Sequence, residues 1–270
     1  LHDALPILKM KIFLIFDFKR AFFSKKTLIA CLIILVFLLI PCYSEIKFHQ
    51  ADVDGINFFI SIGMLSYLPF AAPLIASIPF ANSYILDNEK GIFSKLFTMV
   101  EPKVYFTSRL IINAIVSGFV FLITKTIILI FFIIVYGTNN TKIDVVGAFS
   151  SVYNSSKIAY IIILLIVSFV SAASFSTFIL GVSTLTKSKS IIVLLPLFFV
   201  VVTGVIFQIG GLADKLNVMT LFQMDAFSTI TGIDVIIYDL ILFLIGSFLF
   251  YFFGYKKMQI NKKVEFSCTK

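Results

Sequence analysis

The feature that most constrains this chain is a series of long apolar runs separated by short polar connections. A helix needs roughly 20 apolar residues to cross the hydrocarbon core of a bilayer, and six runs meet this requirement, although the first is short. They cover residues 27–43, 57–83, 110–136, 158–184, 190–208 and 233–255. We therefore predict an all-α integral membrane protein with six transmembrane helices.

The charge content supports the same class of protein. Of the 270 residues, 13% are charged and 60% are hydrophobic, whereas about a quarter of the residues in a soluble domain are charged. The net charge of +8 would suggest nucleic acid as the partner of a soluble protein. In a membrane protein the positions of the charges matter more, so no nucleic-acid partner is expected. Abundant Phe, Ile and Lys together with the absence of Trp favour a bacterial source.

Lysine and arginine are distributed unevenly among the connections. The N-terminal arm, residues 84–109, residues 185–189 and the C-terminal tail together hold 17 of them, whereas the three other connections hold four. Because Lys and Arg collect on the cytoplasmic side of the membrane, we predict that both termini are cytoplasmic.

These runs divide the chain into four parts. Residues 1–9 precede Met10 and resemble translated sequencing adapter, so we predict that they are a non-native leader. Residues 10–26 are predicted to form an amphipathic cytoplasmic helix. The six spans would occupy residues 27–255, and residues 256–270 would form a basic cytoplasmic tail.

The second apolar run contains Pro69, Pro73 and Pro79. Proline removes a backbone hydrogen bond and bends or breaks a helix. We therefore predict a kinked or broken helix, whose freed carbonyl groups are satisfied inside the protein rather than by lipid. The prolines are candidates for a functional hinge, and simple tolerance of proline in a membrane helix is the alternative.

A charged, amphipathic insert separates the second and third runs. Interpreted as a helix over about residues 88–100, it carries one apolar stripe at helical spacing. The stripe comprises Ile92, Phe93, Leu96, Phe97 and Val100. Asp87 and Glu89 stand at the start, where negative charge favours the helix dipole, and Pro102 marks the end. One interpretation is an interfacial helix that rests on lipid headgroups.

The insert also resembles a segment of the permeases of type-2 ABC exporters. It combines an acidic pair, a glycine, an amphipathic turn and a Pro-x-x-Tyr-x-x-x-Arg pattern that leads into the third run. The matching residues are Asp87, Glu89, Gly91, Leu96, Pro102, Tyr105 and Arg109. The arm "FLIFDFKRAFFSKK" resembles the connecting helix of that family, and the six runs and the apolar outer loop before the sixth run also agree.

This resemblance implies that the insert is a coupling helix that docks in a groove of a separate ATPase subunit. Its two phenylalanines would anchor the contact, since buried aromatic side chains dominate such interfaces, and its charged residues would fix orientation at the rim. The predicted coupling residues are Asp87, Glu89, Gly91, Phe93, Lys95, Leu96 and Phe97. The chain would work as a homodimer or with a second permease. It would bind no cofactor itself, while ATP and Mg would be bound by the partner subunit.

A membrane-embedded enzyme is one rival interpretation. The sequence contains no G-x-x-x-x-G-K-[ST] phosphate loop. An enzyme would also need clustered His, Glu or Asp on the spans, but His2 and His49 both lie outside the six runs. The three cysteines are too scattered to indicate a disulfide framework or a metal site. The sequence therefore favours a subunit without a catalytic site of its own.

An ATP-independent secondary transporter or channel is the other rival. Ionisable residues within a span support it, because each costs about 2.5–3.5 kcal/mol to insert. Lys125 and Asp239 are two such residues, and at about 1.5 Å per residue both lie roughly 22 Å from the cytoplasmic ends of their spans. We predict that they form an intramembrane charge pair, with either a structural role or a role in substrate handling.

The resemblance, together with the predicted spans, implies the permease subunit of a bacterial ABC exporter in the cytoplasmic membrane. The cargo is expected to be an amphipathic or hydrophobic peptide, lipid or drug-like molecule, which rests on family analogy. Short apolar helices that dip into the outer leaflet are expected before the sixth run.

Overall fold

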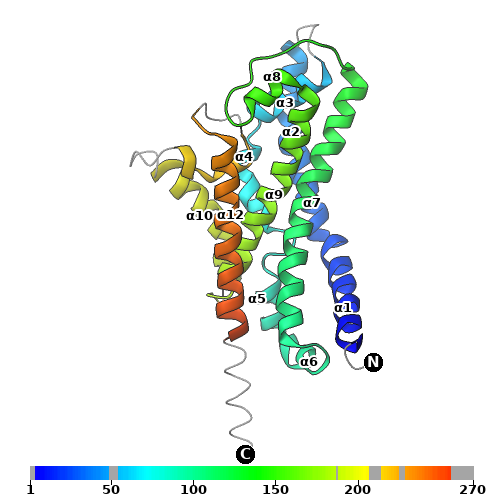
Figure 1. Cartoon of the computed structure of the whole chain (residues 1–270), viewed down its shortest axis with the longest axis vertical. Coiled ribbons are helices and arrows are strands. Elements are labelled where there is room, and N and C mark those ends of the chain that lie inside the picture. Colours follow the sequence, from blue (N-terminus) through cyan, green and yellow to red (C-terminus); the bar gives the residue numbers. More distant parts are fainter. Residues whose placement is uncertain (1–3, 49–53, 187, 207–213, 225–228, 257–270) are drawn as a thin grey trace, which may run out of the picture.

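The computed structural model is an elongated bundle of helices (Figure 1). It describes residues 4–48, 54–186, 188–206, 214–224 and 229–256, and no β-strand occurs among them. The α-helices are α1 (Ala4–Phe22), α2 (Lys25–Phe48), α3 (Gly55–Leu65), α4 (Leu68–Ser77), α5 (Ser83–Glu89), α6 (Ile92–Met99), α7 (Pro102–Tyr136), α8 (Ser150–Ser155), α9 (Lys157–Val182), α10 (Lys189–Val201) and α12 (Gly232–Leu249). Two π-helical segments, η1 (Val202–Ile206) and η4 (Phe250–Tyr255), extend α10 and α12.

Four helical segments are long and apolar enough to cross a membrane: α2, α7, α9 and α12 with η4. The number becomes five if the bent pair α3–α4 is one span. The all-α membrane class is therefore confirmed, whereas the prediction of six spans is not. The predicted fifth span corresponds to α10 and η1, whose apolar helix Lys189–Val205 is shorter than a typical spanning helix. The last two residues of that predicted span, 207 and 208, lie outside the described residues.

The second apolar run is broken, as its prolines predicted. Helices α3 and α4 meet at 83°, and Ser66 between them has an extended backbone. Pro69 lies in the first turn of α4, where its missing N–H is not needed. Pro73 lies within α4, and Pro79 lies in the turn before α5. The predicted kink or break is therefore confirmed, and it lies between α3 and α4.

Carbonyl groups freed by this break are satisfied inside the protein. The Ser66 hydroxyl donates to the carbonyl of Gly63 at 3.0 Å. The side-chain amide of Gln223, far away in the sequence, donates to the carbonyl of Met64 at 3.1 Å. Polar partners from within the chain thus replace the water that is absent from a bilayer.

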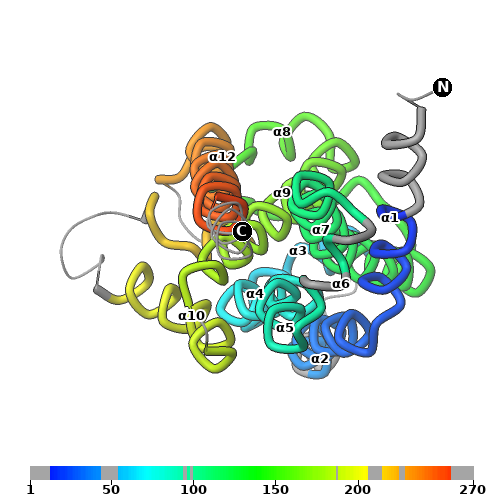
Figure 2. Tube along the Cα trace, turned by 90° about the horizontal axis from the view of Figure 1, so that it is seen from below, coloured from blue at the N-terminus to red at the C-terminus, as the bar shows by residue number. Residues whose placement is uncertain are grey.

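Helix α9 lies at the centre of the bundle and packs against both α7 and α12 (Figure 2). Its middle is rich in small residues, among which Ser171, Ala172, Ser176 and Thr177 are buried. Small residues let membrane helices approach closely. The closest approach joins Gly181 of α9 to α12, because a Cβ atom on Gly181 would lie 2.3 Å from the carbonyl oxygen of Gly246.

The two ends of the bundle differ in the elements that they carry. The first residues of α1, the whole of α6 and the last turns of η4 lie at one end, which we call the α6 end (Figure 1). Helix α8 and the start of α3 lie at the opposite end, which we call the α8 end. Two 3₁₀-helices, η2 (Asp214–Leu216) and η3 (Val218–Leu221), occur in the described part of the loop before α12.

Candidate functional site

The insert between the second and third apolar runs folds as two helices instead of one. Gly91 adopts a left-handed conformation with φ +62°, which is costly for residues with a Cβ atom. This residue separates α5 from α6, so the helix predicted over about residues 88–100 occurs as α6, but it begins at Ile92 instead of residue 88. Val100 is extended, and α7 begins at Pro102. Residues 88–91, at the junction of α5 and α6, are exposed at the α6 end. We call α5, α6 and this junction the elbow.

Three helices bring four charged side chains together beside this elbow. Asp87 of α5 is fully buried. It accepts hydrogen bonds from Arg20 of α1 at 2.8 Å, from the Tyr105 hydroxyl of α7 at 3.1 Å, and from Arg109 of α7. The Arg109 Nε atom also lies 3.4 Å from a carboxylate oxygen of Asp17 in α1. We call Asp17, Arg20, Asp87 and Arg109 the ionic cluster.

Arg109 is the centre of the ionic cluster. It is 1% exposed and lies between the two carboxylates of Asp17 and Asp87. Its guanidinium carbon also lies 4.7 Å from the ring centroid of Phe80 and 5.0 Å from that of Tyr105. Cation–π attraction of this kind strengthens when the cation is desolvated. These contacts tie α1, α5 and α7 together at the base of the elbow.

The two carboxylates of the cluster have different surroundings. Asp87 accepts three hydrogen bonds, whereas neither oxygen of Asp17 has a hydrogen-bond partner among the described residues. Burial therefore raises the pKa of Asp17, while the positive charges of Arg109 and Arg20 oppose this shift. Because Asp87 is enclosed within the chain, the structure differs from the prediction that it lies at the rim of a partner contact.

An aromatic cluster lies next to the ionic cluster. Phe93 and Phe97 of α6 stack with centroids 5.5 Å apart, and both contact the ring of Tyr105 edge-on. Tyr105 in turn contacts Phe106, which packs on Phe250 of η4. The apolar face of α6, including Leu96, is thus half-buried against its own chain. This packing joins α6 to α7 and to the end of α12.

The remaining predicted coupling residues lie on or near the elbow. Glu89 is exposed and forms an ion pair with Lys189 at the start of α10. The side chain of Lys95 lies outside the described residues.

Lys125 and Asp239 are both buried within the bundle, as their positions in the apolar runs predicted. The Lys125 amine donates to the Ser168 hydroxyl at 2.7 Å, and the Ser171 hydroxyl donates to Asp239 at 2.8 Å. Both serines belong to α9, which lies between the two charged residues in the helix order α7, α9, α12. Among the described residues no ion pair joins Lys125 to Asp239.

Sequence reasoning did not identify a polar network at the α8 end. Asp54 is fully buried, caps α3 through the Asn57 backbone N–H at 2.8 Å, and forms an ion pair with Lys157 of α9 at 2.7 Å. It also accepts from the Asn139 backbone N–H at 3.1 Å. An aspartate three residues before Asn57, at the start of an apolar run, is a helix-capping signal that could have indicated this site.

Comparisons with known proteins returned no match. No protein-family model and no curated protein matches the sequence, and no solved structure matches the fold.

Proposed function

We propose that this chain is the membrane-spanning permease subunit of an ATP-driven ABC exporter in the bacterial cytoplasmic membrane. The proposal includes six spans with both termini in the cytoplasm, in which α10 and η1 supply part of the fifth span. It also includes a homodimer or a pair with a second permease, together with two copies of a separate ATPase. The cargo would be an amphipathic or hydrophobic molecule.

The observation that carries the proposal is the attachment of the α5–α6 elbow to the bundle. A pump must pass a nucleotide-driven movement from its ATPase to its membrane helices, and this requires a rigid connection. Asp87 fixes the base of the elbow to α1 and α7 through charged hydrogen bonds, which are the stronger kind. Phe93 fixes α6 to α7 through Tyr105. A push on the exposed elbow would therefore move the spanning helix α7.

The burial pattern of the insert supports a narrower set of docking residues than the coupling residues given above. Phe93 and Phe97 are half-buried against Tyr105, so they would stiffen the elbow from within. Among the side chains of residues 87–99 that the structure describes, those of Asn88, Glu89 and Lys90 are exposed and remain for docking.

Cysteine cross-linking tests this function. Single cysteines would replace Asn88 and Lys90 in a protein whose native cysteines are removed, with Asn140→Cys as the exposed control at the α8 end. Each would be joined by a bismaleimide to cysteines in the groove of the ATPase encoded beside this gene. We expect cross-links from positions 88 and 90 that change with ATP, and none from 140. Free labelling of 88 and 90 by a soluble maleimide with the ATPase present would contradict the proposal.

A secondary transporter or channel is the second candidate function. Its support is the burial of Lys125 and Asp239 within candidate spans, because intramembrane charges are commonly functional. Transport by the purified chain in liposomes that contain no ATPase and no ATP would favour this candidate.

A further inference from the structure

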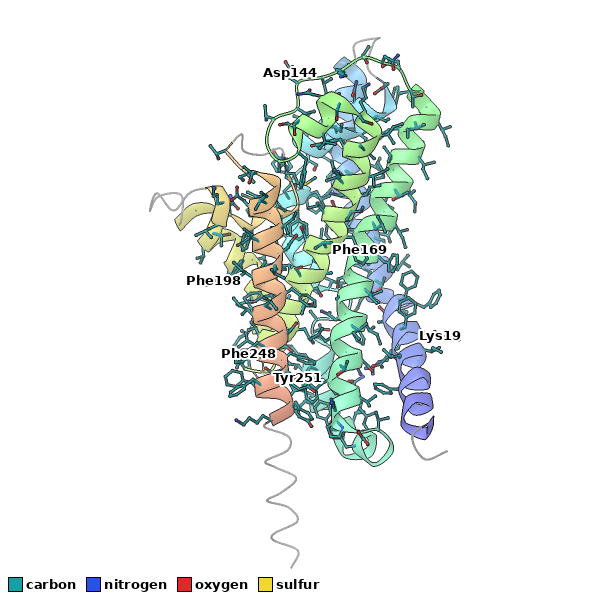
Figure 3. All side chains as sticks on the ribbon, in the orientation of Figure 1. Lys19, Asp144, Phe169, Phe198, Phe248 and Tyr251 are labelled. Carbon is teal, nitrogen blue, oxygen red and sulfur yellow. The ribbon has the colours of Figure 1, made fainter. Side chains whose placement is uncertain are left out.

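A groove between α7, α9 and α12 has an unusual combination of apolar walls and a buried carboxylate. Its volume is about 630 Å³, within the range of small-molecule binding sites. Three aromatic rings and Leu240 contribute to its walls, together with Ser174 and Asp239. The rings are those of Phe149, Phe169 and Phe243. All three helices are candidate spans, so the groove lies at membrane depth, and Figure 3 labels Phe169 near mid-height of the bundle.

Close contacts between neighbouring elements flank the groove at both ends. Toward the α6 end, α9 and α12 touch at Gly181 and Gly246, where an added Cβ atom would meet backbone atoms at 2.3–2.5 Å. Toward the α8 end, an added Cβ atom on Gly232 would lie 2.4 Å from the ring of Phe149. Phe169 of α9 packs against α7, because its ring fills the space beside Gly118 of α7. These contacts fix the helices on either side and leave a space of defined shape between them.

Asp239 lies in the wall of this space, about two turns from the start of α12. It is 3% exposed. One oxygen accepts a hydrogen bond from Ser171, and the other, Oδ1, is buried without a hydrogen-bond partner among the described residues. A buried carboxylate oxygen without a partner is costly. The side chain therefore gains most from a ligand that brings a positive charge.

We propose that this groove binds an amphipathic organic cation, with its ammonium group at Asp239 and its apolar body along α9 and α12. Among the described residues that line the groove none is positively charged, so the carboxylate meets no competing cation from them. The aromatic rings suit the same ligand, because they attract cations and also bury apolar surface. The further statement that this ligand is the exported cargo rests on the function proposed above.

Binding is tested on the purified chain in phosphatidylcholine nanodiscs without any ATPase. The probe is dansylcadaverine, a primary amine whose fluorescence rises in apolar surroundings, and its N-acetyl derivative is the neutral control. We expect the amine to bind at least about tenfold more tightly than the neutral control, because charged hydrogen bonds are the stronger ones. Equal binding of the two probes would overturn the proposal and indicate a groove filled by lipid or by another apolar segment.

Two substitutions and a matched control locate the site. Asp239→Asn removes the charge with little change in size and is expected to weaken amine binding about tenfold while leaving the neutral probe unaffected. Ala173→Phe fills the groove and is expected to weaken the binding of both the amine and its N-acetyl derivative. Asp234→Asn makes the same charge change on the same helix, at the α8 end beside Lys215, and should leave binding unchanged. Amine binding by Asp239→Asn equal to that of the original chain would overturn the proposal.

Transport separates this inference from the proposed function. With the ATPase reconstituted, ATP-dependent export of the amine that is lost in Asp239→Asn would identify the groove as a cargo site. If the amine binds through Asp239 but ATP drives no export, the binding site stands and the cargo role is rejected. Failure of the elbow to cross-link to an ATPase would reject the exporter function without affecting the binding result.

Discussion

Two of the regions in which the described part of the chain buries charge differ in how the charges are compensated. In the ionic cluster at the α6 end, Arg109 lies between Asp17 and Asp87, and Asp87 receives three hydrogen bonds. Deeper in the bundle, Asp239 receives a hydrogen bond from one serine of α9, and one of its oxygens is left without a partner among the described residues.

The difference separates a structural role from a binding role. A buried charge whose partners come from several helices fixes those helices relative to one another, and the loss of one partner leaves the others uncompensated. A buried carboxylate with a single neutral partner fixes little and retains capacity for a ligand. We therefore assign the ionic cluster to mechanical connection and Asp239 to recognition.

The largest effect is expected from Arg109→Met. It leaves the carboxylates of Asp17 and Asp87 buried without their central cation, and removal of one partner from a buried pair typically costs about 3–5 kcal/mol. The free energy of unfolding would be measured by SDS titration of the protein in micelles. Lys103→Met removes a cation from an exposed position of the same helix and should cost less than about 0.5 kcal/mol. Similar losses from the two variants would contradict a structural role for the cluster.

The two carboxylates of the cluster should respond unequally to neutralisation. Asp87→Asn weakens hydrogen bonds from three donors and is expected to cost about 1.5–3 kcal/mol, since hydrogen bonds to charged groups contribute that much. Asp17→Asn replaces a carboxylate that has no hydrogen-bond partner among the described residues and should cost less than about 1 kcal/mol. The same SDS titration compares the two variants, and a larger loss for Asp17→Asn would show that Asp17 contributes more to the cluster than Asp87 does.

Much of the fold followed from local pattern. The apolar runs predicted the long helices because the bilayer requires their length, and the prolines predicted the break between α3 and α4. The elbow was harder to predict, because the apolar stripe begins at Ile92 and does not tell whether the helix extends back through Gly91. The left-handed conformation at that glycine depends on how α5 and α6 pack on α7, which helical periodicity does not contain.

The partners of the buried charges could not be read from spacing alone. Equal depth suggested that Lys125 and Asp239 face each other, but depth fixes one coordinate only. The rotation of α7 and α12 about their axes directs the two side chains to different serines of α9. Similarly, Asp17 and Arg109 are far apart in the sequence, and only the docking of α1 on α7 brings them together.

A double-mutant cycle checks whether the two deeper charges act separately. Lys125→Met and Asp239→Leu are expected to change the free energy of unfolding additively, within about 0.5 kcal/mol, because the two residues bond to different serines. The single and double variants would be unfolded side by side in SDS. If the double variant is markedly more stable than the sum of the two single changes predicts, Lys125 and Asp239 interact directly. The contrast between the two regions would then be weaker.

The smallest effect is a dependence of stability on pH that arises from Asp17. Its pKa is raised in the folded protein because the carboxyl group is buried, so the folded state holds the proton more tightly than the unfolded state. The contribution of Asp17 to stability therefore falls as the pH rises from its ordinary pKa of about 4 through the raised value. As the pH rises over this interval, the thermal midpoint of Asp17→Asn should increase relative to that of the original chain. At higher pH the difference between the two midpoints should stay constant. A shift in the opposite direction would mean that Arg109 and Arg20 stabilise the carboxylate by more than burial destabilises it, and Asp17 would then belong with Asp87 as a fully compensated member of the cluster.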